Sequence, residues 1–239
     1  IEESAGLFNS GLEGILLLGA LAGALGAQAS GSAIIGLMTG ITIGAAVGLI
    51  FGVISTTLRG SQLISGVGIN LFALGFVALM LTVMGAPGFH SVARDVQVPL
   101  IHLGVGSLSP LVIVTVILAV AVWWLLRRTQ LGLWIRAVGE NPAAADVAGL
   151  RVNALRLGAA IAAGAFAGLA GAYLSVDWFG AVTKEITAGR GFIALAIVVF
   201  SGLNPLLALL GGFIFGFFDG LATWVATYPG VKDIIPWQF

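Results

Sequence analysis

The sequence lacks cysteine entirely and holds very little charge. Without cysteine the chain has no disulfide, no thiol nucleophile and no cysteine-based metal site. Charged residues make up 8% of its 239 positions, against about 25% in an ordinary soluble domain. The formal net charge is zero, so the composition gives no indication of nucleic-acid binding.

Hydrophobic residues dominate the composition. They make up 59% of the chain, and the mean hydropathy is +1.12. Only helical bundles and closed barrels span a bilayer, and long apolar runs without period-two alternation select helices. The 36 glycines fit such a bundle, since small residues let helices approach closely. The sequence therefore predicts an all-α, polytopic transmembrane helical bundle.

About seven hydrophobic segments are expected in one transmembrane domain over residues 1–239. Polar loops separate them at residues 85–109 and 180–189, and a longer loop occupies residues 127–156. The expected segments are residues 12–27, 33–56, 62–84, 110–126, 157–178, 192–203 and 206–227. The sixth is short for a span, and Asn204-Pro205 separates it from the seventh, so these two segments are candidates for a re-entrant pair.

The long loop carries the densest positive charge of the chain. Five of the ten cationic residues lie there. Because loops rich in lysine and arginine stay in the cytoplasm, we expect residues 127–156 on the cytoplasmic side and residues 85–109 on the outer side. The five are Arg127, Arg128, Arg136, Arg151 and Arg156.

Sequence signatures of catalysis and cofactor binding are missing. The chain contains neither a Gly-x-x-x-x-Gly-Lys-Ser/Thr phosphate loop nor a Gly-x-Ser-x-Gly nucleophile elbow. His90 and His102 have no third ligand at a recognised spacing, so we interpret both as loop residues. We expect no catalytic residue, no metal and no cofactor. An intramembrane enzyme and a passive channel remain the alternatives to a transport subunit.

Three polar residues lie in or beside apolar segments, where burial is costly. Glu13 either stabilises a helix N-terminus by its charge or serves the pathway of a solute, and the sequence does not choose. An asparagine within a span, such as Asn70, more often forms a hydrogen bond between helices than lines the pathway of a solute. Asp219 has apolar sequence on both sides and no capping role, so it is a functional candidate.

Residues 139–149 predict a short, well-terminated helix inside the long loop. Asn141 suits the N-cap and Pro142 the first helical position. Gly149 suits the left-handed position after the last turn. We expect a helix over residues 143–148 at the cytoplasmic face.

Three motifs, in the same order, resemble the permeases of bacterial ABC importers that serve branched-chain amino acids, ribose-type sugars and nucleosides. Residues 136–149 (RAVGENPAAADVAG) resemble the coupling loop of that family. Residues 9–14 (NSGLEG) resemble a motif near its front, although Ser10 replaces a branched apolar residue. Residues 188–196 (AGRGFIALA), followed by Asn204-Pro205, resemble the late segment of the nucleoside branch. By this resemblance we also expect that the family's first spans and its last one lie outside this chain.

The resemblance implies partners and a mechanism. A second permease subunit would pair with the chain, two cytoplasmic ABC ATPase subunits would dock on its coupling loop, and an extracytoplasmic substrate-binding protein would deliver the solute. The chain would be a multi-pass protein of a bacterial cytoplasmic membrane, working by alternating access. Nucleosides are the first candidate for the solute, simple sugars the second and branched-chain amino acids the third.

The resemblance also assigns residues to two sites. The ATPase-coupling helix, within residues 136–150, would comprise Arg136, Gly139, Glu140, Asn141, Pro142, Ala145 and Gly149. Asn9 and Glu13, in the motif near the front, are the preferred candidates for the substrate path, as residues at a helix break. Polar and aromatic residues on other segments complete the set of candidates, namely Asn70, Phe72, Phe192 and Asp219.

Overall fold

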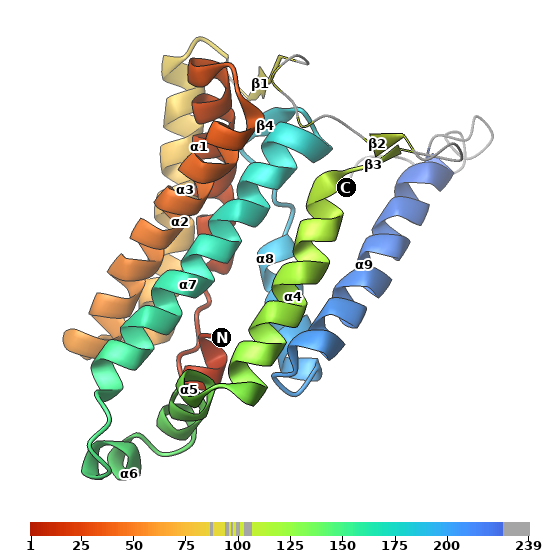
Figure 1. Cartoon of the computed structure of the whole chain (residues 1–239). Helices are drawn as coiled ribbons and strands as arrows, with labels where there is room; N and C mark the ends of the chain where they lie inside the picture. The colour runs from red at the N-terminus through yellow and green to blue at the C-terminus, as the bar shows by residue number, and fades with distance from the viewer. Residues whose placement is uncertain (87, 94–95, 97, 99–100, 103–106, 227–239) are drawn as a thin grey trace.

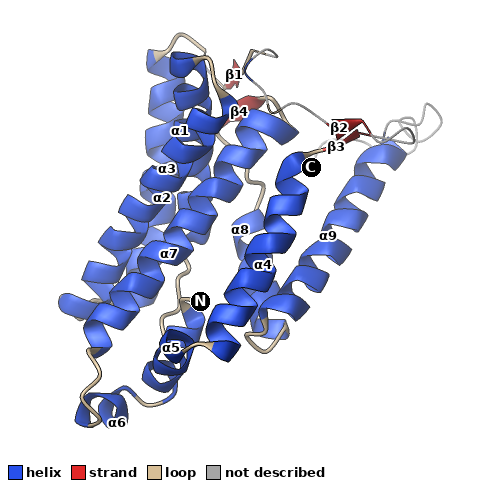
Figure 2. Ribbon diagram, viewed as in Figure 1, coloured by secondary structure: helices blue, strands red, loops and turns tan. Residues whose placement is uncertain are grey.

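The chain forms a bundle of long helices with a few very short strands at one end (Figures 1 and 2). The structure, a computed structural model, describes residues 1–86, 88–93, 96, 98, 101–102 and 107–226. The long helices are α1 (Leu12–Ser30), α2 (Ala33–Gly52), α3 (Gln62–Val83), α4 (Pro110–Arg128), α7 (Val152–Tyr173) and α9 (Pro205–Ala226). The shorter ones are α5 (Gln130–Glu140), α6 (Pro142–Val147) and α8 (Arg190–Phe200), and a 3-10 turn, η1 (Glu3–Ala5), precedes α1.

The predicted all-α membrane bundle is confirmed. Within the described residues, six helices are long and apolar enough to cross a membrane. Two of them end in a π-helical turn, η2 (Val53–Thr57) after α2 and η4 (Leu174–Trp178) after α7. The expected sixth segment is α8, which is too short to cross alone. The segment of residues 127–156, expected as a loop, begins within the last turn of α4, contains α5 and α6, and overlaps the first turns of α7.

Close contact between glycines packs α2 against α7 and α1. Five glycines recur at every fourth position of α2 and are all buried. A Cβ atom on Gly44 would overlap Gly164 and Gly168 of α7, and one on Gly40 would lie 2.9 Å from the carbonyl oxygen of Gly168. Small residues at this spacing let two backbones meet directly, which is how helices associate in lipid. Helices α1, α2, α3 and α7 therefore form one tightly packed group (Figure 1).

Helices α4 and α9 stand apart from this group. They pack on each other, and α8 lies between them and the tight group in Figure 1, in contact with both α1 and α9. Almost none of α4 and none of α9 is buried within the chain. We call α1, α2, α3 and α7 the tight half of the bundle and α4 and α9 the loose half. Helix α8 lies between the two halves.

The two ends of the bundle differ in character. At one end, called the strand face below, β1 (Phe89–Ser91) pairs antiparallel with β4 (Ala181–Thr183), and β2 (Ile101–His102) pairs with β3 (Ser107–Leu108). The side chain of Gln28, near the end of α1, contacts His90 at 2.7 Å. The other end, called the arginine face, holds α5, α6 and the start of α7 (Figure 1). The cytoplasmic location of the arginine face and the outer location of residues 85–109 stay predictions.

Candidate functional site

The arginine face carries two short helices where the sequence predicts one. Helix α5 follows α4 after a single residue, Thr129, whose hydroxyl accepts a hydrogen bond from the Gly132 amide at 3.2 Å. Gly132 is required here because a Cβ atom would overlap the Leu125 carbonyl oxygen at the end of α4. Together with Gly132, Ile135 and Val138 form the buried face of α5. Helix α5 is therefore fixed rigidly to the end of α4.

The start of the chain braces α5 from its other side. A Cβ atom on Gly139 would overlap the Ser4 carbonyl oxygen of η1. Arg156, in the second turn of α7, donates from Nε to the Ala5 carbonyl oxygen at 3.1 Å. This contact links α7 to η1 and, through η1, to α5. A displacement of α5 would therefore act on both halves of the bundle.

Helix α6 has the caps that the sequence predicts. The Asn141 side-chain oxygen accepts a hydrogen bond from the Ala144 amide at 3.0 Å, and Pro142 opens the helix. Gly149 has a φ angle of +84°, and its amide donates to the Asp146 carbonyl oxygen at 2.9 Å. The Leu150 amide donates to the carbonyl oxygen of Ala145 at 3.0 Å, which completes a Schellman motif.

Helix α6 projects from the bundle at the tip of the arginine face (Figure 1). Ala145 is its one buried residue, and Glu140 and Asn141 at its start are exposed. The side chain of Val147 is 91% exposed, although it is apolar and belongs to a segment outside the candidate spans. A projecting helix with an apolar tip is a surface that a protein partner can cover.

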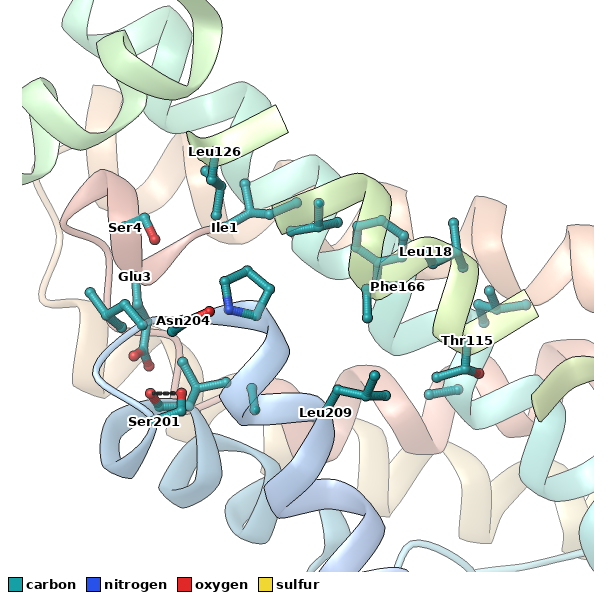
Figure 3. A pocket seen from close by; sticks show the side chains of 18 of the residues that line it. Ile1, Glu3, Ser4, Thr115, Leu118, Leu126, Phe166, Ser201, Asn204 and Leu209 are labelled. Carbon is teal, nitrogen blue, oxygen red and sulfur yellow. Dashed lines mark hydrogen bonds between the residues drawn. The ribbon is translucent and has the colours of Figure 1, made fainter. Parts of the chain in front are cut away.

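A cleft opens between the tight half and the loose half. Two adjoining cavities, of about 480 and 440 Å³, share Phe166 and Tyr173 of α7 and Val198 of α8 as walls. In Figure 3 four of the five labelled polar residues of the larger cavity gather at one end, whereas Thr115 lies at the other end among apolar side chains such as Leu118. The gathered polar residues are Glu3, Ser4, Ser201 and Asn204.

Asn9 is buried and lines the smaller cavity. Its side-chain nitrogen donates to both carboxylate oxygens of Glu2, at 3.2 and 3.4 Å, and its oxygen accepts from the Gly11 amide at 2.9 Å. Burial raises the pKa of Glu2 to about 8, although the Asn9 hydrogen bond opposes this shift. Asn9 thus orders the break before α1.

Glu13 joins the start of α1 to the start of α8. Its carboxylate accepts hydrogen bonds from the amides of Gly189 at 2.9 Å and Gly191 at 2.7 Å. These amides lie at the N-terminus of α8, where the helix dipole favours a negative charge. The sequence suggested that Glu13 stabilises its own helix or serves the pathway of a solute. The structure shows a third role, because Glu13 caps a different helix, α8.

Asn70 makes the helix contact that its position favours. Its side-chain oxygen accepts from the Gly14 amide at 2.8 Å, and its nitrogen donates to the Ser10 carbonyl oxygen at 2.9 Å. Asn70 on α3 therefore satisfies two backbone groups at the start of α1. The interpretation of Asn70 as a packing residue agrees with these contacts.

Asp219 forms an ion pair with an arginine at the start of α8. Arg190, the first residue of α8, contacts the Asp219 Oδ2 atom through Nη2 at 2.8 Å. The guanidinium carbon of Arg190 also lies 5.5 Å from the centroid of the Phe179 ring. Both members of the pair line a third cavity, of about 520 Å³, between α8 and α9.

A comparison with known protein families identifies the family of this chain. Residues 1–237 match the family described as the permease component of the branched-chain amino acid transport system. The chain belongs to this family. It is therefore a permease component of an ABC transporter, and a multi-pass membrane protein.

Curated relatives of the permease differ in the solute that their names give. The chain is 36% identical to a putative glucose ABC transporter permease of Haloferax volcanii, over 92% of its own length and 70% of the relative's. It is 30% identical to a nucleoside ABC transporter permease of Lactococcus lactis and 32% identical to a guanosine ABC transporter permease of Bacillus subtilis. Each of these two matches covers 97% of the chain and 78% of the relative. No solved structure matches the permease.

The structure separates the six candidates for the substrate path. Asn9 and Asp219 each line one of the three cavities described above, and the other four candidates line none of these three. Phe72 stacks on Phe76 of the same helix, and its side chain is exposed, as is that of Phe192. The substrate roles of all six stay predictions.

Sequence reasoning missed α5 and the placement of Arg190. A signal for α5 was present in Thr129, a favourable N-cap residue directly after the two arginines that end α4. A signal for Arg190 was its position between two glycines at the start of a short apolar segment, with an unpaired carboxylate at Asp219 elsewhere in the chain. The sequence alone could not pair Arg190 with Asp219, because only the fold brings these two residues together.

Replacing Glu13 with alanine should destabilise the permease by about 2–4 kcal/mol, because two amides at the start of α8 lose a charged acceptor. The variant Glu13→Gln keeps one acceptor oxygen and should lose less. Thermal unfolding in lipid nanodiscs measures both. The matched control is Glu185→Ala, whose side chain is 76% exposed. Equal unfolding temperatures for Glu13→Ala and the control would contradict the capping role.

Proposed function

We propose that this permease imports nucleosides through the cleft between its two halves, driven by ATPase subunits that bind α5 and α6. Two such ATPase subunits, a second permease subunit and an extracytoplasmic substrate-binding protein complete the transporter. The cleft opens alternately to the two sides as the loose half moves against the tight half.

The exposed tip of α6 is the observation that carries the ATPase-binding role. Val147 and its alanine neighbours form an apolar surface on a helix whose ends are both capped. Helix α5 connects this tip to α4 without a flexible linker, and η1 connects it to α7. Movement of an ATPase bound at α6 would thus reach both sides of the cleft. Arg136, Gly139 and Glu140 belong to α5 in this arrangement, and Pro142 and Ala145 belong to α6.

Two kinds of support favour a nucleoside as the solute. Relatives named for nucleoside and guanosine transport match 97% of the chain, and the segment 188–196 resembles the nucleoside branch. The cleft also offers aromatic faces from Phe166 and Tyr173, with polar groups at one end. A nucleoside has an apolar base and a hydroxylated sugar, and so fits a cavity of mixed character.

A simple sugar is the second candidate. The relative named as a putative glucose permease has the higher identity, 36%, over most of the chain. Glucose lacks an aromatic base, so it would make less use of Phe166 and Tyr173. Branched-chain amino acids are the third candidate, on the strength of the family description.

Uptake into proteoliposomes that contain the complete transporter tests this function. We expect ATP-dependent uptake of radiolabelled guanosine, inhibited by excess adenosine and unaffected by excess leucine. Uptake of glucose without guanosine would overturn the nucleoside assignment and keep the ATP-driven mechanism. Guanosine flux that continues at the same rate without ATP would overturn the mechanism and indicate a passive channel.

A further inference from the structure

The Arg190–Asp219 pair lies far inside the membrane-spanning region. Asp219 follows about 20 Å of α9 and precedes about 10 Å of it, at 1.5 Å per helical residue. Helix α8, which begins at Arg190, is about 16 Å long by the same measure, roughly half a span. The chain runs from β4 at the strand face into the bundle before α8 begins (Figure 1).

This ion pair is too exposed for a surface that faces lipid. The Asp219 side chain is 51% exposed and that of Arg190 is 29% exposed. Charged groups inside a membrane almost always face a bundle interior or a water-filled cavity, because hydrocarbon cannot solvate them. The cavity of about 520 Å³ between α8 and α9 is therefore part of an aqueous or protein-lined space. Arg190 also lines the smaller cavity of the cleft, so the two spaces are neighbours.

Arg190 is held on several sides, and Asp219 is not. The guanidinium group contacts Asp219, the Phe179 ring and, at 3.4 Å, the Ile186 carbonyl oxygen. Asp219 uses its Oδ2 atom for Arg190, and within the described part of the chain its Oδ1 atom makes no hydrogen bond. The fixed arginine orients the carboxylate through Oδ2, and the residue lines the cavity.

The surroundings of the Asp219 carboxylate suit a ring that carries hydroxyl groups. Phe215 and Phe218 of α9 line the same cavity and provide apolar faces. Gly212 and Gly216 also line it, and a Cβ atom at either glycine would meet nothing within 4 Å. A flat solute can therefore approach the α9 backbone directly. Ionised carboxylates accept hydrogen bonds only, and they can accept two at once.

We propose that Asp219, oriented by Arg190, binds the vicinal hydroxyl groups of a neutral solute as it crosses the membrane. Two neighbouring hydroxyls donate to the carboxylate, while the rings of Phe215 and Phe218 contact the apolar side of the solute. Phosphorylated solutes are repelled by the carboxylate, and leucine has no hydroxyl to donate. The proposal rests on the proposed function, because it deepens the nucleoside assignment, and it applies equally to a simple sugar.

A structural role for the pair makes a different prediction. If Arg190 and Asp219 only join α8 to α9, a change at Asp219 alters the transport of every solute by the same factor. If the carboxylate binds a vicinal diol, the change penalises solutes that have the diol. The loss of a charged hydrogen-bonding partner in a binding site commonly costs a factor of about 10–100.

The test compares guanosine with 2′,3′-dideoxyguanosine, which lacks the diol, in proteoliposomes with saturating substrate-binding protein. The same binding protein serves each permease variant, so a change in the ratio of the two uptake rates reports the permease. We expect Asp219→Asn to lower guanosine uptake about tenfold or more, and dideoxyguanosine uptake by less than about twofold. The matched control is Thr223→Val, one turn further along α9, which removes a hydroxyl bonded to the Asp219 carbonyl oxygen at 2.9 Å. It should leave the ratio unchanged.

The outcomes distinguish a failure of the diol site from a failure of the proposed nucleoside import. Equal losses for both solutes would overturn the diol site and leave nucleoside import intact. Uptake of glucose but not guanosine would overturn the nucleoside assignment, and the same comparison with 2,4-dideoxyglucose, which has no two neighbouring hydroxyls, would then test the diol site. Uptake of leucine alone would overturn both.

A second measurement needs no variant, and so does not depend on how well Asp219→Asn folds. The wild-type permease in nanodiscs should unfold at a higher temperature with millimolar guanosine than with millimolar 2′,3′-dideoxyguanosine. Equal effects of the two compounds on the unfolding temperature would contradict the diol site.

Discussion

The variant Gly168→Leu should yield no stably folded permease. Gly168 lies where α7 crosses α2, and a Cβ atom there would overlap the Gly40 carbonyl oxygen and come within 2.8 Å of the Gly44 Cα atom. These neighbours are backbone atoms, which cannot move aside as a side chain can. Overpacking an ordinary core costs about 1–3 kcal/mol, and forcing two helices apart should cost more, out of a typical total of about 5–15 kcal/mol.

A matched substitution on the same helix separates packing from residue size. Gly158 also belongs to α7, is exposed, and has nothing within 4 Å of the position of a Cβ atom. Gly158→Leu should therefore retain the wild-type yield and unfolding temperature, measured by size-exclusion chromatography and thermal unfolding in nanodiscs. Similar behaviour of the two variants would show that the contact between α2 and α7 does not hold the tight half together.

The variant Val147→Asp should abolish uptake and leave the amount of folded permease unchanged. Val147 contributes little to the fold, since 91% of its side chain is exposed. If an ATPase subunit covers this tip, the aspartate becomes a charge buried without a partner, and truncations or charges at such central positions commonly cost about 2–4 kcal/mol or more. Co-purification of the ATPase with the permease measures the loss directly.

An aspartate at the opposite end of the bundle is the control for this result. Phe89 of β1 lies on the strand face and is also exposed. Phe89→Asp should keep the ATPase bound at the wild-type level. ATPase retention by Val147→Asp would remove α6 from the docking surface.

The sequence predicted most of the spans and the caps of α6. Apolar runs are a strong signal because lipid excludes charge along a whole span, so α2, α3 and α9 begin within one residue of their expected starts. The caps were predictable because Asn141 and Gly149 act through their own backbone neighbours. Local signals of this kind do not depend on the remainder of the fold.

The contacts that join α8 to the bundle were beyond a reading of the sequence alone. Glu13 and Gly191 are 178 positions apart, and the hydrogen bond between them exists only because the chain enters the bundle from β4 before α8 begins. The Arg190–Asp219 pair depends on the same entry. Counting loop charges does not locate Arg190, because such counts assume that each loop stays outside the membrane.

A single introduced cysteine tests most directly the central claim that α6 is where the ATPase engages this permease. The chain has no cysteine of its own, so Val147→Cys would place a unique thiol at the tip of α6. In the complete transporter, a short thiol-to-amine crosslinker should join position 147 to an ATPase subunit, and should not do so from Ser91→Cys on the strand face. Crosslinking of the ATPase from position 91 and not from position 147 would contradict the account.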